Sequence, residues 1–108
     1  MLSSFGRFLR KWRIEHDVKA TVMAKAVGCS KTYLYSMEEG IRSPSDEMTA
    51  RLADFMNLSE EDRHVMQLCI DQSRKVWMID MTQFSQEARA LLVAFVEGLK
   101  KGYGDARD

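Results

Sequence analysis

Apolar side chains recur at intervals of three and four residues along most of this 108-residue chain, in short runs that glycines and one proline interrupt. This spacing places apolar side chains on one face of an α-helix, because a helix has about 3.6 residues per turn. Gly28 and Gly40 end two of the runs, since glycine adopts the left-handed conformation at a helix end without a Cβ clash. The pattern therefore predicts a mainly α fold built from short helices.

We expect five helices in the first two thirds of the chain. Serine residues suited to capping stand before three of them, at Ser3 or Ser4, Ser30 and Ser59. Pro44 suits the first turn of the fourth helix, and Asn57 can replace glycine at its end. The helices are predicted to run from residue 3 or 4 to 16, from 19 to 27, from 31 to 39, from about 43–45 to 57, and from 59 to 73.

After Arg74 the pattern changes. The short segment 75–82 is rich in β-branched and large residues, which predicts a β-strand. A single strand leaves its backbone groups unpaired, and the chain offers no second strand, so we expect residues 76–82 to pair antiparallel with the same strand of a second copy. A wide apolar stripe from Ser85 to Lys101 predicts a last helix. The alternative is that this extension packs on the core of its own subunit.

Dimerisation is the interpretation we prefer for this extension, which spans residues 74–108 and follows a first domain of residues 1–73. The residues expected at the dimer interface are Val76, Trp77, Met78, Ile79, Met81, Leu91, Leu92, Phe95 and Leu99.

Several classes of function find no support in the sequence. Cys29 and Cys69 lack metal-ligand spacing, so we expect no metal site and no cofactor. No glycine-rich phosphate loop and no nucleophile beside a base is present, so we expect no catalytic residues and no enzyme. No leader and no apolar run long enough to span a membrane is seen, which predicts a cytoplasmic protein without a membrane partner.

The segment 20–36 combines two short predicted helices with a tight turn. Ala24 is small where the helices cross, and Gly28 makes the turn. Such a rigid pair lets its second helix enter the major groove of DNA. The side chains free to reach phosphates or base edges there are Lys31, Thr32, Tyr33, Tyr35 and Ser36.

The sequence resembles the XRE family, the Cro and phage-repressor type of helix-turn-helix, over residues 5–70, because the matching residues keep the family's spacing across all five predicted helices. The residues that carry the resemblance are Leu9, Arg10, Arg13, Met23, Ala24, Gly28, Cys29, Ser30, Leu34, Met37, Glu38, Gly40, Pro44, Leu52, Ala53, Met56, Asn57 and Leu58. The resemblance implies a five-helix DNA-binding domain that acts as a homodimer on a palindromic operator. It places base reading on Lys31, Thr32, Tyr35 and Ser36, and a structural ion pair on Arg13 and Glu38.

Two positions depart from the family pattern. Lys19 and Ala20 stand where the family commonly has Ser or Thr followed by Gln, whose side chain meets a phosphate and braces the recognition helix. That brace is absent here, and Lys19 is expected to contact phosphate by charge alone. Ile41 stands where the family often has a polar or basic residue, which leaves Arg42 and Ser43 as the expected backbone contacts.

These observations predict a transcriptional regulator that binds double-stranded DNA sequence-specifically, most simply a homodimeric repressor from a bacterium, phage or other mobile element. Two alternatives remain open: an antitoxin or operon autoregulator with a protein partner such as a toxin, and a protein-interaction module that kept the fold without DNA binding. The overall charge is zero, but residues 1–45 hold eight Lys and Arg against four Asp and Glu. The basic half is therefore the one expected to face DNA.

Overall fold

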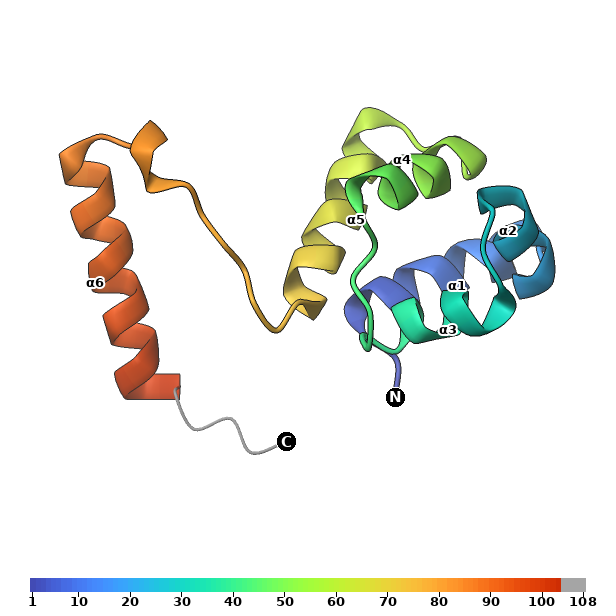
Figure 1. Cartoon of the computed structure of the whole chain (residues 1–108), viewed down its shortest axis with the longest axis horizontal. Coiled ribbons are helices and arrows are strands. Elements are labelled where there is room, and N and C mark those ends of the chain that lie inside the picture. The colour runs from blue at the N-terminus through green and yellow to red at the C-terminus, as the bar shows by residue number, and fades with distance from the viewer. Residues whose placement is uncertain (104–108) are drawn as a thin grey trace. The chain divides into compact units, whose positions relative to one another are not determined.

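A computed structural model of the chain describes residues 1–103. The chain forms two compact units, of which the first comprises Met1–Trp77 and the second begins at Met78. The first unit contains five helices (Figure 1), which are α1 (Ser4–His16), α2 (Ala20–Val27), α3 (Lys31–Glu38), α4 (Asp46–Phe55) and α5 (Glu60–Ser73). Each of these helices lies within two or three residues of the range that the apolar spacing predicts.

Polar caps fix where these helices begin. The hydroxyl groups of Ser3, Ser30 and Ser59 each accept a hydrogen bond from a backbone N–H of the following first turn. The fourth helix begins later than predicted, because Ser45 is its N-cap and Pro44 lies before the helix as a buried residue. Asn57 has φ 50°, as expected for a residue that replaces glycine after a helix.

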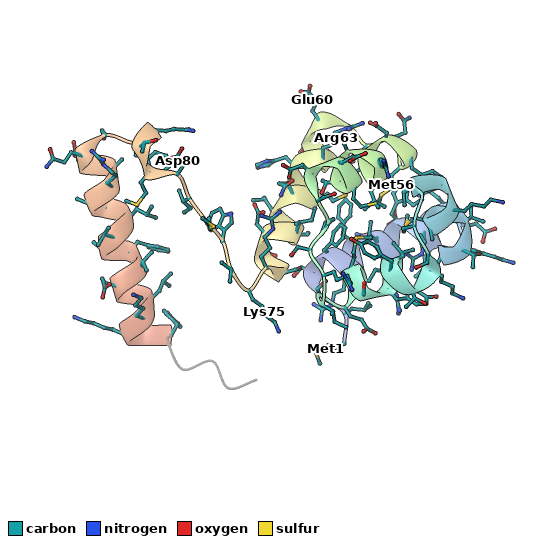
Figure 2. All side chains as sticks on the ribbon, viewed as in Figure 1. Met1, Met56, Glu60, Arg63, Lys75 and Asp80 are labelled. Atoms are coloured by element: carbon teal, nitrogen blue, oxygen red, sulfur yellow. The ribbon has the colours of Figure 1, made fainter. Side chains whose placement is uncertain are left out.

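One hydrophobic core holds the first unit together. Helix α1 packs against both α5 and α3, while α2 packs against α3 and α4. Figure 2 shows side chains filling the space between these helices, with Met56 inside the unit and Glu60 at its outer edge. The buried apolar residues are Phe5, Leu9, Met23, Ala24, Val27, Leu34, Met37, Leu52, Ala53, Met56, Met66 and Ile70. All of them precede residue 71, so the five helices share a core to which residues 71–103 contribute no buried apolar residue.

The predicted β-strand at 76–82 is wrong, because residues 1–103 of the structure contain no strand. Residues 75–80 have no regular structure, and Met81–Gln83 form a short 3₁₀ helix, η1. The carboxylate of Asp80 accepts hydrogen bonds from the backbone N–H and the hydroxyl of Thr82, at 3.0 and 2.6 Å. These local bonds turn the chain where a strand would have to continue, and β-branched composition alone supplies no pairing partner.

The second unit consists mainly of α6 (Gln86–Tyr103), which the Ser85 hydroxyl caps by accepting from the backbone N–H of Ala88 at 3.1 Å. This helix has no buried residue. Among the residues that the structure describes, no helix is long and apolar enough to cross a membrane.

Candidate nucleic-acid interface

Helices α2 and α3 are joined by a tight turn at residues 28–30. Gly28 has φ 80°, a left-handed conformation that a residue with a Cβ adopts with strain. Its N–H donates to the carbonyl of Lys25, and the N–H of Cys29 donates to the carbonyl of Ala24 at 2.9 Å. Arg51 of α4 adds a hydrogen bond to the Val27 carbonyl at 3.4 Å. Backbone hydrogen bonds to α2 and a side-chain hydrogen bond from α4 thus hold the turn in place.

The inner face of α3 is fixed by three completely buried side chains, Leu34, Met37 and Glu38. With 3.6 residues per turn, the direction opposite these three is occupied by Thr32 and Ser36. Thr32 is exposed and Ser36 is half-buried. Two hydroxyl groups therefore stand at the centre of the outward face of α3.

A cation and a tyrosine flank this hydroxyl pair on each side. On one side, Lys31 Nζ lies 5.6 Å from the centre of the Tyr35 ring. On the other side, the guanidinium carbon of Arg42 lies 5.5 Å from the centre of the Tyr33 ring. Both distances are within the range of cation–π attraction, which orients the cations while leaving their N–H groups free to bind an anion. The result is a polar strip with a positive charge at each edge.

The loop after α3 is tied to the same strip. The backbone N–H groups of Ile41 and Arg42 both donate to the Ser36 carbonyl, at 2.9 and 3.2 Å. Gly40, at φ 77°, permits this sharp return of the chain. The Ser36 hydroxyl donates to the Tyr33 carbonyl at 2.7 Å, and its oxygen lone pairs remain available to an external donor. The loop thus places Arg42 beside α3.

A buried ion pair links α3 to α1. The Glu38 side chain is 0% exposed, and Arg13 is 7% exposed. The two Arg13 Nη atoms face the two carboxylate oxygens of Glu38, so the pair is bidentate. Arg10, whose Nε lies 3.6 Å from Glu38 Oε1, adds a second cation at the surface. The carboxylate is therefore compensated twice, which keeps the end of α3 in a fixed position on α1.

The N-terminus of α1 also holds this end of α3. Ser3 donates to the Glu38 carbonyl from both its hydroxyl and its backbone N–H, at 2.8 and 2.9 Å. A Cβ at Gly6 would overlap the same carbonyl. The sequence pattern does not predict the role of Gly6 or Arg10, although a glycine inside a helical pattern is a signal of close packing.

The other residues predicted to contact DNA lie outside the polar strip of α3. Lys19 is the exposed N-cap residue of α2, and its side chain makes no capping hydrogen bond. Ser43 is exposed in the loop before α4. The predicted interface residues of the extension are divided: Val76, Trp77, Met78 and Ile79 are exposed in the segment without regular structure, Met81 is half-buried in η1, and Leu91, Leu92, Phe95 and Leu99 belong to α6.

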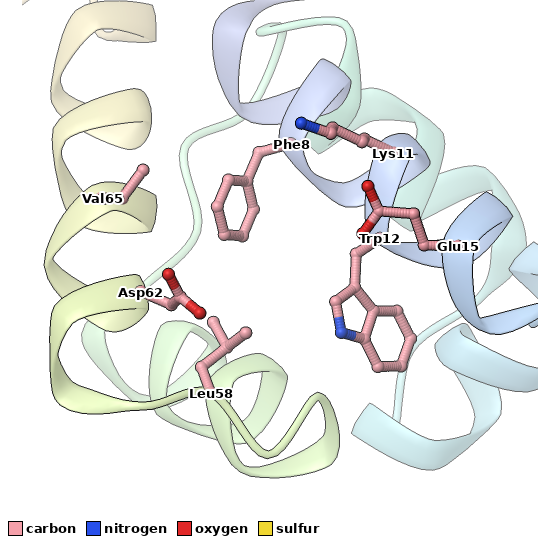
Figure 3. A pocket seen from close by; sticks show the side chains of 7 residues that line it. All are labelled: Phe8, Lys11, Trp12, Glu15, Leu58, Asp62 and Val65. Carbon is pink, nitrogen blue, oxygen red and sulfur yellow. The ribbon is translucent and has the colours of Figure 1, made fainter.

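A separate groove of about 310 Å³ lies between α1 and α5. Figure 3 shows its apolar side chains, Phe8, Trp12, Leu58 and Val65, with Asp62 among them. Trp12 also stacks on His16 with 4.3 Å between ring centres. This groove contains none of the residues of the α3 strip, and the described residues hold no group of three or more His, Cys, Asp or Glu arranged for a metal ion.

Comparison with known proteins agrees with this geometry. The sequence profile of the helix-turn-helix domain family matches residues 4–66. The chain is also 42% identical over 53 residues to the ImmF control region 10 kDa protein of Bacillus phage phi105, a match that covers 49% of this chain and 59% of that protein. The chain thus spans about three fifths of the length of this relative. No solved structure matches significantly.

Proposed function

Because the chain belongs to the helix-turn-helix domain family, we propose that it is a DNA-binding transcriptional regulator that inserts α3 into the major groove. In this proposal it acts as a homodimeric repressor. Two copies of α3 bind two half-sites of a palindromic operator about one DNA turn apart, and the bound dimer blocks the promoter. The proposal places the protein in the cytoplasm, where its DNA is.

The observation that carries this proposal is the polar strip on α3. Thr32 and Ser36 present hydroxyl groups, which can bind base edges or phosphates. Lys31 and Arg42 lie at the two edges of the strip, each against a tyrosine ring. Phosphates line both sides of a major groove, so a helix with hydroxyl groups at its centre and cations at its edges matches the order of groups it meets there.

The distribution of charge supports the same orientation. Residues 1–45 contain α1, α2, α3 and the loop with Arg42, and they hold eight of the 16 Lys and Arg but only four of the 16 Asp and Glu. The rest of the chain therefore carries the acidic excess. A basic face toward DNA and an acidic remainder favour association in one orientation.

A role in gene control is supported by the phage relative. Its name describes a protein of a control region, and 42% identity extends over 53 residues of the two chains. We extend this description to the present chain as a regulator of transcription. Steric occlusion of a promoter requires only tight DNA binding, which this proposal assigns to the two copies of α3 in the dimer and the contacts that brace them.

Binding to the DNA upstream of the protein's own gene tests the proposal. Titration with labelled duplex at 50 and 200 mM salt should show affinity that falls by orders of magnitude as salt rises. Lys31→Ala and Ser36→Ala should each weaken specific binding by about 1–3 kcal/mol. Lys75→Ala removes the same charge from the exposed segment after α5, and it should change specific binding little.

Two results would contradict the proposal. If the chain binds neither that duplex nor generic duplex at low salt, the DNA-binding proposal is wrong and a protein-interaction module becomes the better description. If Lys31→Ala and Ser36→Ala both bind like the unchanged protein, α3 is not the element that contacts DNA.

A further inference from the structure

The hydroxyl group of Ser36 already donates a hydrogen bond within α3. Its oxygen lies 2.7 Å from the carbonyl oxygen of Tyr33, and only the hydroxyl can supply the hydrogen atom between these two oxygens. Serine commonly forms such a bond to a carbonyl three or four residues earlier in the chain. The Ser36 oxygen is therefore left with lone pairs that can accept a hydrogen bond and with no hydrogen atom to donate.

The surroundings of Ser36 hold its side chain in this state. The backbone N–H groups of Ile41 and Arg42 both donate to the Ser36 carbonyl, at 2.9 and 3.2 Å, which ties the residue to the loop after α3. Ser36 is half-buried, whereas Thr32, one turn earlier on the same face, is exposed. To donate to DNA, the Ser36 hydroxyl would have to give up its bond to Tyr33, and this loss opposes the donor role.

We propose that Ser36 reads one base pair of each half-site as an acceptor, from the N6 amino group of adenine or the N4 amino group of cytosine. These amino groups are the hydrogen-bond donors that bases present in the major groove, whereas guanine O6, thymine O4 and the purine N7 atoms are acceptors. Each base pair holds one such amino group, so Ser36 fixes which strand carries the adenine or cytosine. The inference deepens the proposed function and rests on it for the placement of α3 in the major groove.

The two cations of the polar strip cannot fill this acceptor role. Lys31 and Arg42 lie at the edges of the strip, and both side chains carry donors only. These donors suit phosphates and the acceptor atoms of guanine and thymine. A base amino group that enters the interface without an acceptor loses affinity, because its hydrogen bond to water is not replaced. Ser36 provides an acceptor at the centre of the strip, between the two cations.

Binding-site selection from a random duplex library, carried out with the full chain, identifies the base pair that Ser36 reads. Ser36→Ala should relax the selection at one base pair of each half-site. Ser36→Cys keeps the size of the side chain but accepts hydrogen bonds weakly, so it should relax the same base pair. Glu39→Ala removes an exposed carboxylate just after α3 and should leave that base pair unchanged. Circular dichroism should show equal helix content in all variants.

Removal of single groups from that base pair then tests which atom Ser36 meets. Purine in place of adenine, or 2-pyrimidinone in place of cytosine, lacks only the amino group, and the unchanged protein should bind this duplex about tenfold more weakly. Ser36→Ala should bind the duplexes with and without the amino group with nearly equal affinity. The matched control is 7-deazaadenine or 7-deazaguanine in the same base pair, which removes the N7 acceptor and keeps the amino group of the pair. This control should change the affinity of both proteins by the same factor.

Failure of this inference can be told apart from failure of the proposed function. If Ser36→Ala relaxes no base pair, or loses as much affinity as the unchanged protein when the amino group is removed, Ser36 is not the acceptor of that group. Coupling of Ser36→Ala to the 7-deaza duplex instead would show that Ser36 donates. All three results leave DNA binding intact. A library that yields no selected sequence, from a protein that binds no duplex at low salt, would overturn the proposed function and this inference with it.

Discussion

The α-carbon of Gly6 lies directly against the main-chain carbonyl of Glu38, where the start of α1 meets the end of α3, and no side chain fits between them. Buried Phe5 and Leu9 flank this contact on α1, and Glu38 is itself buried. The position of α3 therefore depends on the absence of a single methyl group from another helix.

Gly6→Ala should destabilise the first unit by about 1–3 kcal/mol, because α1 and α3 must move apart to admit the Cβ. Urea unfolding followed by Trp12 fluorescence, in a Trp77→Phe background, measures this change. Gly98→Ala is the matched control, since the added Cβ meets no atom within 4 Å. If both substitutions had the same effect on the first unit, the contact between Gly6 and Glu38 would not be the tight one described.

The Arg13–Glu38 pair should show strong energetic coupling. Arg13→Met leaves Glu38 with only the partly exposed Arg10, and Glu38→Gln leaves Arg13 buried without its carboxylate. Glu38→Gln should cost about 3–5 kcal/mol of unfolding free energy, because it leaves the buried Arg13 charge uncompensated, and Arg13→Met should cost less because Arg10 still faces the Glu38 carboxylate. The double variant Arg13→Met/Glu38→Gln should cost much less than the sum of the two, and urea unfolding of all three variants would reveal simple additivity if the pair were uncoupled.

Tyr33 should act on DNA binding through Arg42, whose guanidinium carbon lies 5.5 Å from its ring centre. Tyr33→Leu removes the ring that orients the guanidinium, while Tyr33→Phe retains it. We expect Tyr33→Leu to weaken DNA binding and Tyr33→Phe to change it little. In an Arg42→Ala background, Tyr33→Leu should have no further effect, and an undiminished effect there would mean that Tyr33 contacts DNA directly.

Burial raises the pKa of the Cys29 thiol and of the Cys69 thiol above its ordinary value. Only the thiolate reacts with alkylating agents, so both residues should react more slowly with iodoacetamide at pH 8 than a free cysteine does. The rate should continue to rise at pH values where a free thiol has already reached its maximum. Cys29→Ser and Cys69→Ser isolate each thiol, and a fast rate at neutral pH would contradict the expected direction.

The first unit should fold without α6, because its whole apolar core precedes residue 71. A chain of residues 1–77 should retain cooperative thermal unfolding by circular dichroism. It should also sediment as a monomer and bind operator DNA more weakly than the full chain, since two half-sites are no longer held together. A shortened chain that still dimerises would show that an interface exists within the first unit.

Much of the helical architecture could be predicted from local signals. The apolar spacing, the serine caps and the left-handed residues Gly28 and Asn57 act within one or two turns of the chain, so they can be read along the sequence. The segment 76–82 could not be predicted in this way. Strand formation depends on a partner at a distance, whereas the Asp80 and Thr82 hydrogen bonds that shape this segment are short-range and compete with it.

The sequence by itself determined where α1 to α6 form, which face of α3 is apolar, and that the chain carries a helix-turn-helix. Only the tertiary structure decided how α3 is held and equipped: Gly6 and Ser3 against the Glu38 carbonyl, Arg10 as a second cation, and the tyrosine beneath each of Lys31 and Arg42. The physical reason is the separation along the sequence over which each kind of interaction acts. Helix propensity and capping act between neighbours in the chain, but close backbone approach and charge compensation arise after the helices have packed, between residues far apart in the sequence, such as Ser3 and Glu38, which are separated by 35 positions.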